Sequence, residues 1–330
     1  MLVRPSDLPD SSVVAALSAG WGLGVVSAEY LPVGFGSHHW RIFDDRNTSW
    51  FATVDDLRVR LWGGNDSLDD ARTRLRTALV TARAIADAGA SFVVAPVFRC
   101  DSEVLGGISD TYAIALYPYV EGRRFGFGDV FSPHERADVI ATLAALHVTA
   151  EPTRRTAMKE TFDLPQRQLL LSALDDRDTP WDTGPYGEPA RGVLVTHVEL
   201  IERLLARHDQ RATEARKRPD RMVLTHGEPH PGNLIQTREG WKLVDWDTAL
   251  LAPPERDLWS LHPTDDPNES RYTDLTGMQL ERPMLTHYRE AWALNDIAAF
   301  VSQFRQPHVD DANQREAWTA LTETLADVAS

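Results

Sequence analysis

The chain has 330 residues, 42% hydrophobic and 25% charged, a length and composition that allow two domains with buried cores. Its formal net charge of −15 argues against a nucleic-acid partner, whose phosphates need a basic surface. No apolar run reaches the roughly 18 residues of a membrane-spanning helix, and the start "MLVRPSDLPDSS" lacks the apolar core of a signal peptide. Cys100 is the only cysteine, so no internal disulfide can form, and we expect a cytoplasmic protein.

The first 120 residues predict two helices and five strands. A short helix from Asp10–Ser11 to "AGWG" precedes strands at about 25–32, 38–43 and 49–54, and "VGFGS" makes a Gly-x-Gly hairpin between the first two. "SLDDARTRLRTALVTARAIADAG" predicts an amphipathic helix with Ser67 as its cap. The runs "SFVVAPVFR" and "TYAIALYPYVEG" predict two more strands, which gives a small lobe with five antiparallel strands.

The remainder of the chain predicts helices. "SPHERADVIATLAALHVTA" carries a capping box of Ser132 and Glu135, and "ARGVLVTHVELIERLLARHDQRATEAR" predicts one long amphipathic helix. The tail from about Leu285 is helical again, and Asp296 within it is interpreted as a solvated charge rather than a substrate contact. We therefore predict an α+β fold with domains at 1–120 and 121–330.

The segment "LTHGEPHPGNLI", residues 224–235, carries polar side chains that suit either of two sites. His226, Glu228 and His230 could bind zinc, but Pro229 and Pro231 exclude the helix on which two zinc-binding histidines share one face. A phosphotransfer site needs a carboxylate near the acceptor hydroxyl, an asparagine and a strand-borne aspartate for metal ions. The segment and the following "KLVDWD" supply these in order, which favours phosphotransfer.

At these motifs the chain resembles the aminoglycoside phosphotransferase family, small-molecule kinases with a two-lobed, protein-kinase-like fold. "THGEPHPGNLI" is similar to the family's catalytic loop and "LVDWD" to its metal-binding strand, while "LAPPERDL" resembles the spectinomycin phosphotransferase branch. The resemblance implies Glu228 as the catalytic base, His226 as a brace of the loop, and Asn233 and Asp245 as Mg²⁺ ligands. It also implies ATP or GTP as phosphate donor, with nucleotide contacts at Gly34, Gly36, Ser37, Tyr119 and Val120.

Two positions depart from the family's pattern. Glu228 stands where the family has an aspartate, and Thr53 stands where its third strand has a lysine. The helix acid that pairs with this lysine is also missing, since residues 71–86 contain no Asp or Glu, so the site is interpreted as rebuilt without that ion pair. Candidates for the phosphate contacts are the backbone of "GFGS" and the side chains of Ser37, His38, His39 and Arg41.

Two of the remaining assignments stay open between a structural and a functional role. Arg41 is interpreted as a solvated strand charge in preference to a phosphate contact, and Asp247 either contacts the metal or braces the loop. Asp257 is interpreted as a structural aspartate outside the site.

The leading hypothesis is a Mg²⁺-dependent kinase for a hydroxyl group of a small molecule, such as an aminoglycoside, an amino sugar or another alcohol. An acidic protein can attract a cationic acceptor, although solubility is the preferred explanation of the charge. The alternative is a catalytically impaired pseudokinase that binds a nucleotide or small molecule as a regulator, suggested by Glu228 and Thr53. The presence of both Asn233 and Asp245 favours the enzyme.

Overall fold

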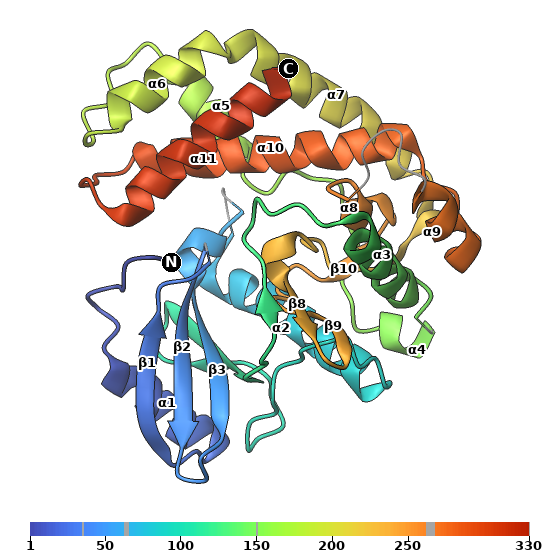
Figure 1. Cartoon of the computed structure of the whole chain (residues 1–330). Helices are drawn as coiled ribbons and strands as arrows, with labels where there is room; N and C mark the ends of the chain where they lie inside the picture. The colour runs from blue at the N-terminus through green and yellow to red at the C-terminus, as the bar shows by residue number, and fades with distance from the viewer. Residues whose placement is uncertain (35, 63–65, 150, 262–267, 330) are drawn as a thin grey trace. The chain divides into compact units, whose positions relative to one another are not determined.

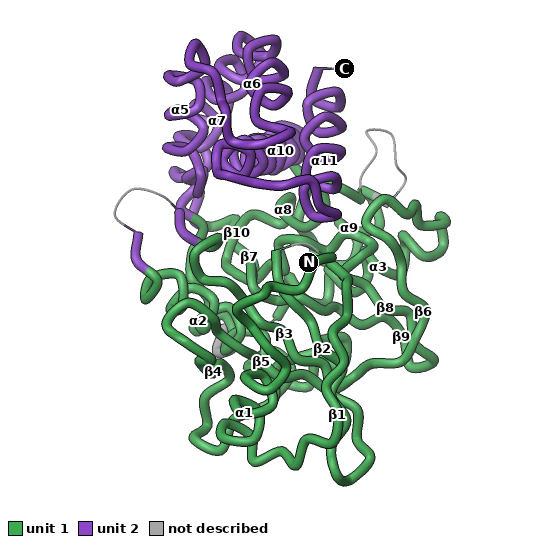
Figure 2. The backbone as a smooth tube through the Cα atoms, turned by 90° about the vertical axis from the view of Figure 1, so that its left-hand side faces the viewer, with its two compact units in different colours: residues 1–60, 68–160, 220–281 green, residues 61–67, 161–219, 282–330 purple. Residues whose placement is uncertain are grey.

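The computed structural model of the protein describes residues 1–34, 36–62, 66–149, 151–261 and 268–329. The chain forms two compact units, residues 1–60, 68–160 and 220–281 in the first and residues 61–67, 161–219 and 282–330 in the second (Figure 2). The two units are compact parts of the structure and do not test the division by function, so the predicted domain boundary at residue 120 stays a prediction. None of the helices in the described ranges is both long and apolar enough to span a membrane.

The first unit contains a five-stranded antiparallel sheet with the strand order β1-β2-β3-β5-β4. Figure 1 labels the first three of these strands. Its strands are β1 (Val25–Leu31), β2 (Ser37–Asp44), β3 (Ser49–Asp56), β4 (Gly106–Gly107) and β5 (Tyr112–Pro118). The three strands predicted on either side of "VGFGS" and "DDRN" are confirmed.

The strand predicted at "SFVVAPVFR" is wrong. This segment makes an isolated bridge between Val93 and Leu243 and one backbone hydrogen bond to β5, from Val97 to Leu116. The neighbouring place in the sheet is taken by β4. Pro96 has no N–H to donate, which prevents a continuous ladder through the middle of the segment. Val93, Val94 and Ala95 are buried here without pairing as a strand, whereas Phe98 is exposed.

The two faces of this sheet carry different kinds of residue. Helix α1 (Asp10–Trp21) and the segment before it bury Leu8, Val13 and Leu17 against an apolar face formed by Trp40, Ile42, Ala52, Val54, Ile114 and Leu116. Side chains alternate along a strand, so the next residues in sequence point to the opposite face. Ser37 pairs there with Asp55 and His39 with Thr53, which makes that face polar.

The rest of the first unit holds two small sheets and several helices. β7 (Val223–Thr225) pairs with β10 (Leu250–Ala252), and β8 (Leu234–Thr237) lies between β6 (Arg123–Arg124) and β9 (Gly240–Leu243). The helices are α2 (Leu68–Asp87), α3 (Pro133–His147), α4 (Glu151–Arg154), α8 (Glu255–Leu258) and α9 (Asn268–Thr276), with the short turns η1 (Leu57–Arg60), η2 (Pro219–Arg221) and η3 (Pro231–Asn233). The capping box of α3 is confirmed, with Ser132 and Glu135 each bonded to the other's backbone N–H.

The second unit is built from helices around one apolar core. Its helices are α5 (Arg167–Asp175), α6 (Gly187–Thr196), α7 (Val198–Ala215), α10 (Arg282–Phe304) and α11 (Ala312–Ala329), and their buried faces meet in a core that includes Ile201, Leu204, Ile297, Phe304 and Leu321. Asp296 on α10 is half-buried, so its interpretation as a solvated charge is wrong. Burial raises the pKa of this carboxyl to about 7, against the hydrogen bond from Trp292.

The single long helix predicted over residues 190–216 is wrong, because the segment forms α6 and α7 with a break at His197. A continuous helix would bond the N–H of His197 to the carbonyl of Val193. Instead the ring Nδ1 of His197 lies 2.8 Å from that carbonyl oxygen, and the backbone N–H donates to Leu194. The histidine side chain therefore competes with its own backbone and ends the helix.

Candidate functional site

Asp257 fixes the start of the segment that begins at His226. β7 is buried along its whole length and leads directly into this segment. The carboxylate of Asp257, on α8, accepts hydrogen bonds from the backbone N–H of His226 at 2.8 Å and of Gly227 at 2.6 Å. Burial would raise the pKa of Asp257, but its hydrogen bond with His147 holds the pKa below the usual value, so it remains an anionic anchor.

His226 uses both ring nitrogens to hold backbone. Nδ1 accepts the N–H of Glu228 at 3.2 Å, so Nε2 carries the proton and donates it to the carbonyl of Val244 at 2.8 Å. Burial lowers the pKa of the ring, and its edge packs on Trp246 with ring centroids 4.6 Å apart. His226 therefore links the two segments that carry Glu228 and Asp245, and neither ring nitrogen remains for zinc.

Asn233 is oriented by two hydrogen bonds from its amide nitrogen. Nδ2 donates to the backbone carbonyl of Glu228 at 3.0 Å and to Nε2 of His230 at 3.2 Å. Both amide hydrogens are then used, which leaves Oδ1 to accept from another group or to bind a cation. The backbone carbonyl of Asn233 accepts the N–H of Val244, so Asn233 and the neighbour of Asp245 are joined directly.

Asp245 follows β9 in an unusual backbone conformation, with φ of 64°. Few residues other than glycine adopt this left-handed region, and aspartate is among those that tolerate it. Desolvation by the surrounding protein, together with the negative charges of Asp247 and Glu228, raises the pKa of Asp245 well above its usual value. The residue nevertheless keeps access to solvent. Carboxylates that disfavour one another's ionisation in this way attract a cation.

The oxygen ligands suit magnesium better than zinc. Among the described residues, no group of three His, Cys, Asp or Glu side chains converges to hold a metal ion alone. Magnesium is usually held by one or two protein carboxylates, with phosphate oxygens and water completing its shell. The carboxylate of Asp245 and Oδ1 of Asn233 match this partial ligand set.

The turn before β2 and the first residue of β2 carry three of the predicted nucleotide-binding residues, Gly34, Gly36 and Ser37. Gly34 and Gly36 have φ of 70° and 89°, which a residue with a β-carbon rarely adopts, and Phe35 between them lies outside the described residues. The amino terminus of Met1 donates to the carbonyls of Val33, Gly34 and Ser37 at 3.0, 2.8 and 2.7 Å. The carbonyls of this turn are therefore used within the protein, while its two glycines allow a ligand to approach the backbone closely.

Tyr119 and Val120, the predicted adenine contacts, follow β5. The N–H of Tyr119 donates to the carbonyl of Ser49 at 3.3 Å, and the carbonyl of Val120 accepts from Arg124 at 3.2 Å. Arg41 stacks over the ring of Tyr119, 4.2 Å from its centroid, so its interpretation as a solvated charge is wrong. Arg41 therefore lies at the segment after β5 and not at the glycine turn.

Arg60 and Asp55 were missed by the reading of the sequence. One terminal nitrogen of Arg60 contacts Asp55 at 2.6 Å, Asp247 at 2.5 Å and Ser37 at 3.2 Å. Asp247 therefore forms an ion pair with Arg60. The signal in the sequence was "VDDLRVR", where an acid at the end of a strand is followed by an arginine five residues later.

A cavity of 420 Å³ lies within the second unit, lined among others by Trp62, Phe162 and His208. No residue predicted for the site lines it, and we assign it no role.

Comparison with known proteins places these observations in a family. The model of the phosphotransferase enzyme family matches residues 44–293 of the chain. The protein StrN of Streptomyces griseus is 28% identical over 253 residues, which cover 73% of this chain and 74% of that protein.

Solved structures of antibiotic kinases share the fold. Spectinomycin phosphotransferase APH(9)-Ia in complex with ADP and spectinomycin has a TM-score of 0.71 at 18% identity, covering 97% of both chains. The amicoumacin kinase hAmiN in complex with AMP-PNP and Ca²⁺ has a TM-score of 0.59 at 12% identity, covering 97% of this chain and 93% of that one. The predicted α+β, protein-kinase-like fold is confirmed by this likeness.

Proposed function

The chain belongs to the phosphotransferase enzyme family, and we propose that it transfers the γ-phosphoryl group of ATP or GTP to a hydroxyl group of a small molecule. The observation that carries this proposal is the assembly of Glu228, Asn233 and Asp245 by direct contacts. Asn233 donates to the backbone of Glu228 and accepts from the residue before Asp245, and the charges of Glu228 and Asp247 act on Asp245.

In the proposed reaction, the acceptor hydroxyl oxygen forms a bond to the γ-phosphorus as the bond from that phosphorus to the bridging oxygen breaks. The proton of the hydroxyl passes to the carboxylate of Glu228, and the nucleoside diphosphate leaves. Glu228 is half-buried, with its backbone held on both sides by His226 and Asn233. A fixed backbone keeps the carboxylate at one place, which is what positioning of a base requires.

Asn233 through Oδ1 and Asp245 through its carboxylate would hold Mg²⁺. When bound, this ion neutralises charge on the phosphates of the nucleotide. The role of the protein is to hold these oxygens in a fixed arrangement. The two hydrogen bonds of the Asn233 amide nitrogen fix the position of Oδ1.

We expect the acceptor to carry an amino group. A net charge of −15 favours a cationic small molecule over an anionic one. The fold neighbour APH(9)-Ia binds spectinomycin, which makes amino-substituted ring alcohols the first class to test.

A second candidate is a nucleotide-binding regulator without turnover, which Thr53 at the usual lysine position and Glu228 at the usual aspartate position favour. The test is incubation of the purified protein with ATP or GTP, Mg²⁺ and a panel that includes spectinomycin, other amino-bearing antibiotics and amino sugars. Formation of a phosphorylated acceptor, detected by mass spectrometry and lost in Asp245→Ala, supports the enzyme. Nucleotide binding without product across a broad panel supports the regulator.

A further inference from the structure

The polar face of the five-stranded sheet holds no lysine. Thr53 lies on this face, and the first lysine of the chain is Lys159. His39, paired with Thr53 on the same face, stacks on Phe51 with ring centroids 5.0 Å apart. Burial lowers the pKa of His39 to about 3, so the ring is neutral at physiological pH. Among the side chains of this face, a positive charge must therefore come from an arginine.

Arg60 provides that charge at a fixed place. It ends η1, which follows β3 directly, and its backbone carbonyl accepts a hydrogen bond from Arg74 at 2.9 Å. Its guanidinium contacts Asp55 through Nε at 3.1 Å and through Nη2 at 2.6 Å. Asp55 is only 3% exposed at its side chain, so this carboxylate is a rigid anchor for the guanidinium.

The same Nη2 of Arg60 contacts both the glycine turn and the segment that carries Asp245. It lies 3.2 Å from Oγ of Ser37, at the glycine turn, and 2.5 Å from the carboxylate of Asp247, beside Asp245. The side chain of Arg60 is 21% exposed, so a ligand can reach it while Asp55 holds it. A guanidinium in this position presents several N–H groups in a plane that matches the oxygens of a phosphate.

We propose that Arg60 contacts the phosphates of the nucleotide and supplies the positive charge that Thr53 cannot. This inference rests on the phosphotransfer function proposed above. Asp55 is the positioning residue that holds the guanidinium, and Ser37 brings it to the glycine turn. A fixed cation at the phosphates stabilises the charge that develops during phosphoryl transfer.

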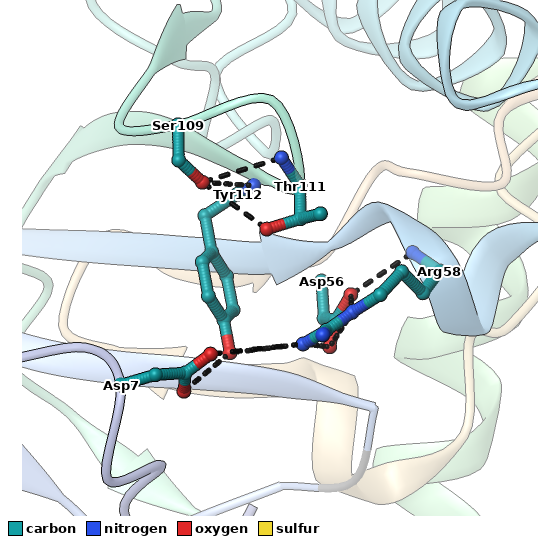
Figure 3. A network of polar contacts seen from close by, with 6 residues as sticks. All are labelled: Asp7, Asp56, Arg58, Ser109, Thr111 and Tyr112. Carbon is teal, nitrogen blue, oxygen red and sulfur yellow. Dashed lines mark hydrogen bonds and ion pairs between the residues drawn. The ribbon is translucent and has the colours of Figure 1, made fainter.

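Arg58 shows what a purely structural arginine looks like in the same segment. It is bonded to Asp56 at 2.6 Å and to the hydroxyl of Tyr112 at 3.2 Å, and Tyr112 donates in turn to Asp7 (Figure 3). Asp55 and Asp56 point to opposite faces of the sheet, since side chains alternate along β3. The contacts of Arg58 lie with the residues near α1, whereas those of Arg60 lie with Ser37 and Asp247.

The experiment compares Arg60→Gln with Arg58→Gln in the full chain. Isothermal titration calorimetry measures the affinity of each variant for ATP, GTP, adenosine, guanosine and inorganic tripolyphosphate, each in the presence of Mg²⁺. Loss of charge-assisted hydrogen bonds to phosphate is expected to weaken triphosphate and tripolyphosphate binding by about 10- to 100-fold in Arg60→Gln, with unchanged nucleoside affinity. Arg58→Gln is expected to bind all of these ligands as the unaltered protein does.

Removal of Arg60 leaves Asp55 buried without its partner, so folding is monitored by circular dichroism and melting temperature. The double variant Arg60→Gln with Asp55→Asn removes both charges and gives the same comparison if the single variant does not fold. Equal triphosphate affinity in the unaltered protein and in the folded Arg60 variant overturns the role of Arg60 and leaves the phosphotransfer function standing. Failure of the unaltered protein to bind either nucleotide overturns both.

Discussion

The guanidinium of Arg256 occupies the space that a β-carbon on Gly227 would fill. Gly227 has φ of 103°, in the left-handed region, and a β-carbon built on it would overlap both terminal nitrogens of Arg256. Arg256 uses these nitrogens to donate to Thr225 Oγ1 and to the carbonyl of Thr248, each at 3.0 Å. The segment of residues 224–235 therefore needs a residue without a side chain between His226 and Glu228.

Gly227→Ala is expected to destabilise the protein by about 2–4 kcal/mol, because it combines backbone strain with displacement of a hydrogen-bonded arginine. Gly192→Ala is the matched control: Gly192 lies exposed in α6 with no atom near its missing β-carbon, and alanine there is expected to stabilise by about 0.5–1 kcal/mol. Urea unfolding of the two variants measures both values. Equal stability of Gly227→Ala and the unaltered protein would contradict the assignment.

Glu228→Asp is expected to lower kcat by about 10- to 100-fold, although it restores the residue type of the family. The backbone N–H of Glu228 is bound to His226 and its carbonyl to Asn233, so the backbone cannot shift to compensate for a shorter side chain. A displacement of about 1 Å costs roughly a hundredfold in rate.

Glu228→Gln removes the base and is expected to lower kcat by about 10²–10⁴-fold. The rate at which the phosphorylated acceptor forms gives kcat for both variants. The control is Glu239→Gln, which changes an exposed acid in the turn after β8. Unchanged kcat in Glu228→Gln would remove Glu228 from the reaction.

Asp296 is expected to make the stability of the protein depend on pH. Burial raises its pKa to about 7 in the folded protein, against about 3.9 in the unfolded chain. The folded state therefore favours the protonated form, so the contribution of Asp296 to stability is complete below about pH 4 and is lost as the pH rises through about 7.

Asp296→Asn removes this dependence. At pH 8 the variant is expected to be more stable than the unaltered protein by about 1–2 kcal/mol, below the limit of ~4 kcal/mol set by the pKa shift, because the side chain is only half-buried. At pH 4 the difference is expected to vanish. Thermal unfolding across this range measures it, with the exposed Asp182→Asn as control. A constant difference at all pH values would show that Asp296 does not titrate as described.

The first three strands could be predicted from the sequence because the turns that separate them carry strong local signals. Gly34 and Gly36 mark one turn, and the polar run before Ser49 marks the next. The capping box of Ser132 and Glu135 is likewise a local pattern and was found. Each of these features depends on residues within a few positions of one another.

The errors arose where distant or side-chain contacts decide the structure. The run containing Val93 and Val94 has strand composition, but Phe92 and Val94 form their backbone bonds with Leu243, far along the chain, and only Val97 bonds to the sheet, at Leu116. His197 ends α6 through its own side chain, which periodicity does not report. The contact of Arg60 with Asp247 joins residues 187 positions apart, so the local pattern "VDDLRVR" could indicate the pair with Asp55 but not the contact with Asp247.

The central claim is that Asp245 belongs to a working nucleotide and metal site. The most direct test is the melting temperature of the protein and of Asp245→Ala, with and without millimolar ATP or GTP and Mg²⁺. A ligand at a hundred times its dissociation constant stabilises by about 2.7 kcal/mol, which raises the melting temperature by a readable amount. We predict a Mg²⁺-dependent rise in the unaltered protein that is absent in Asp245→Ala. No rise with either nucleotide, or an equal rise in the variant, would contradict the claim.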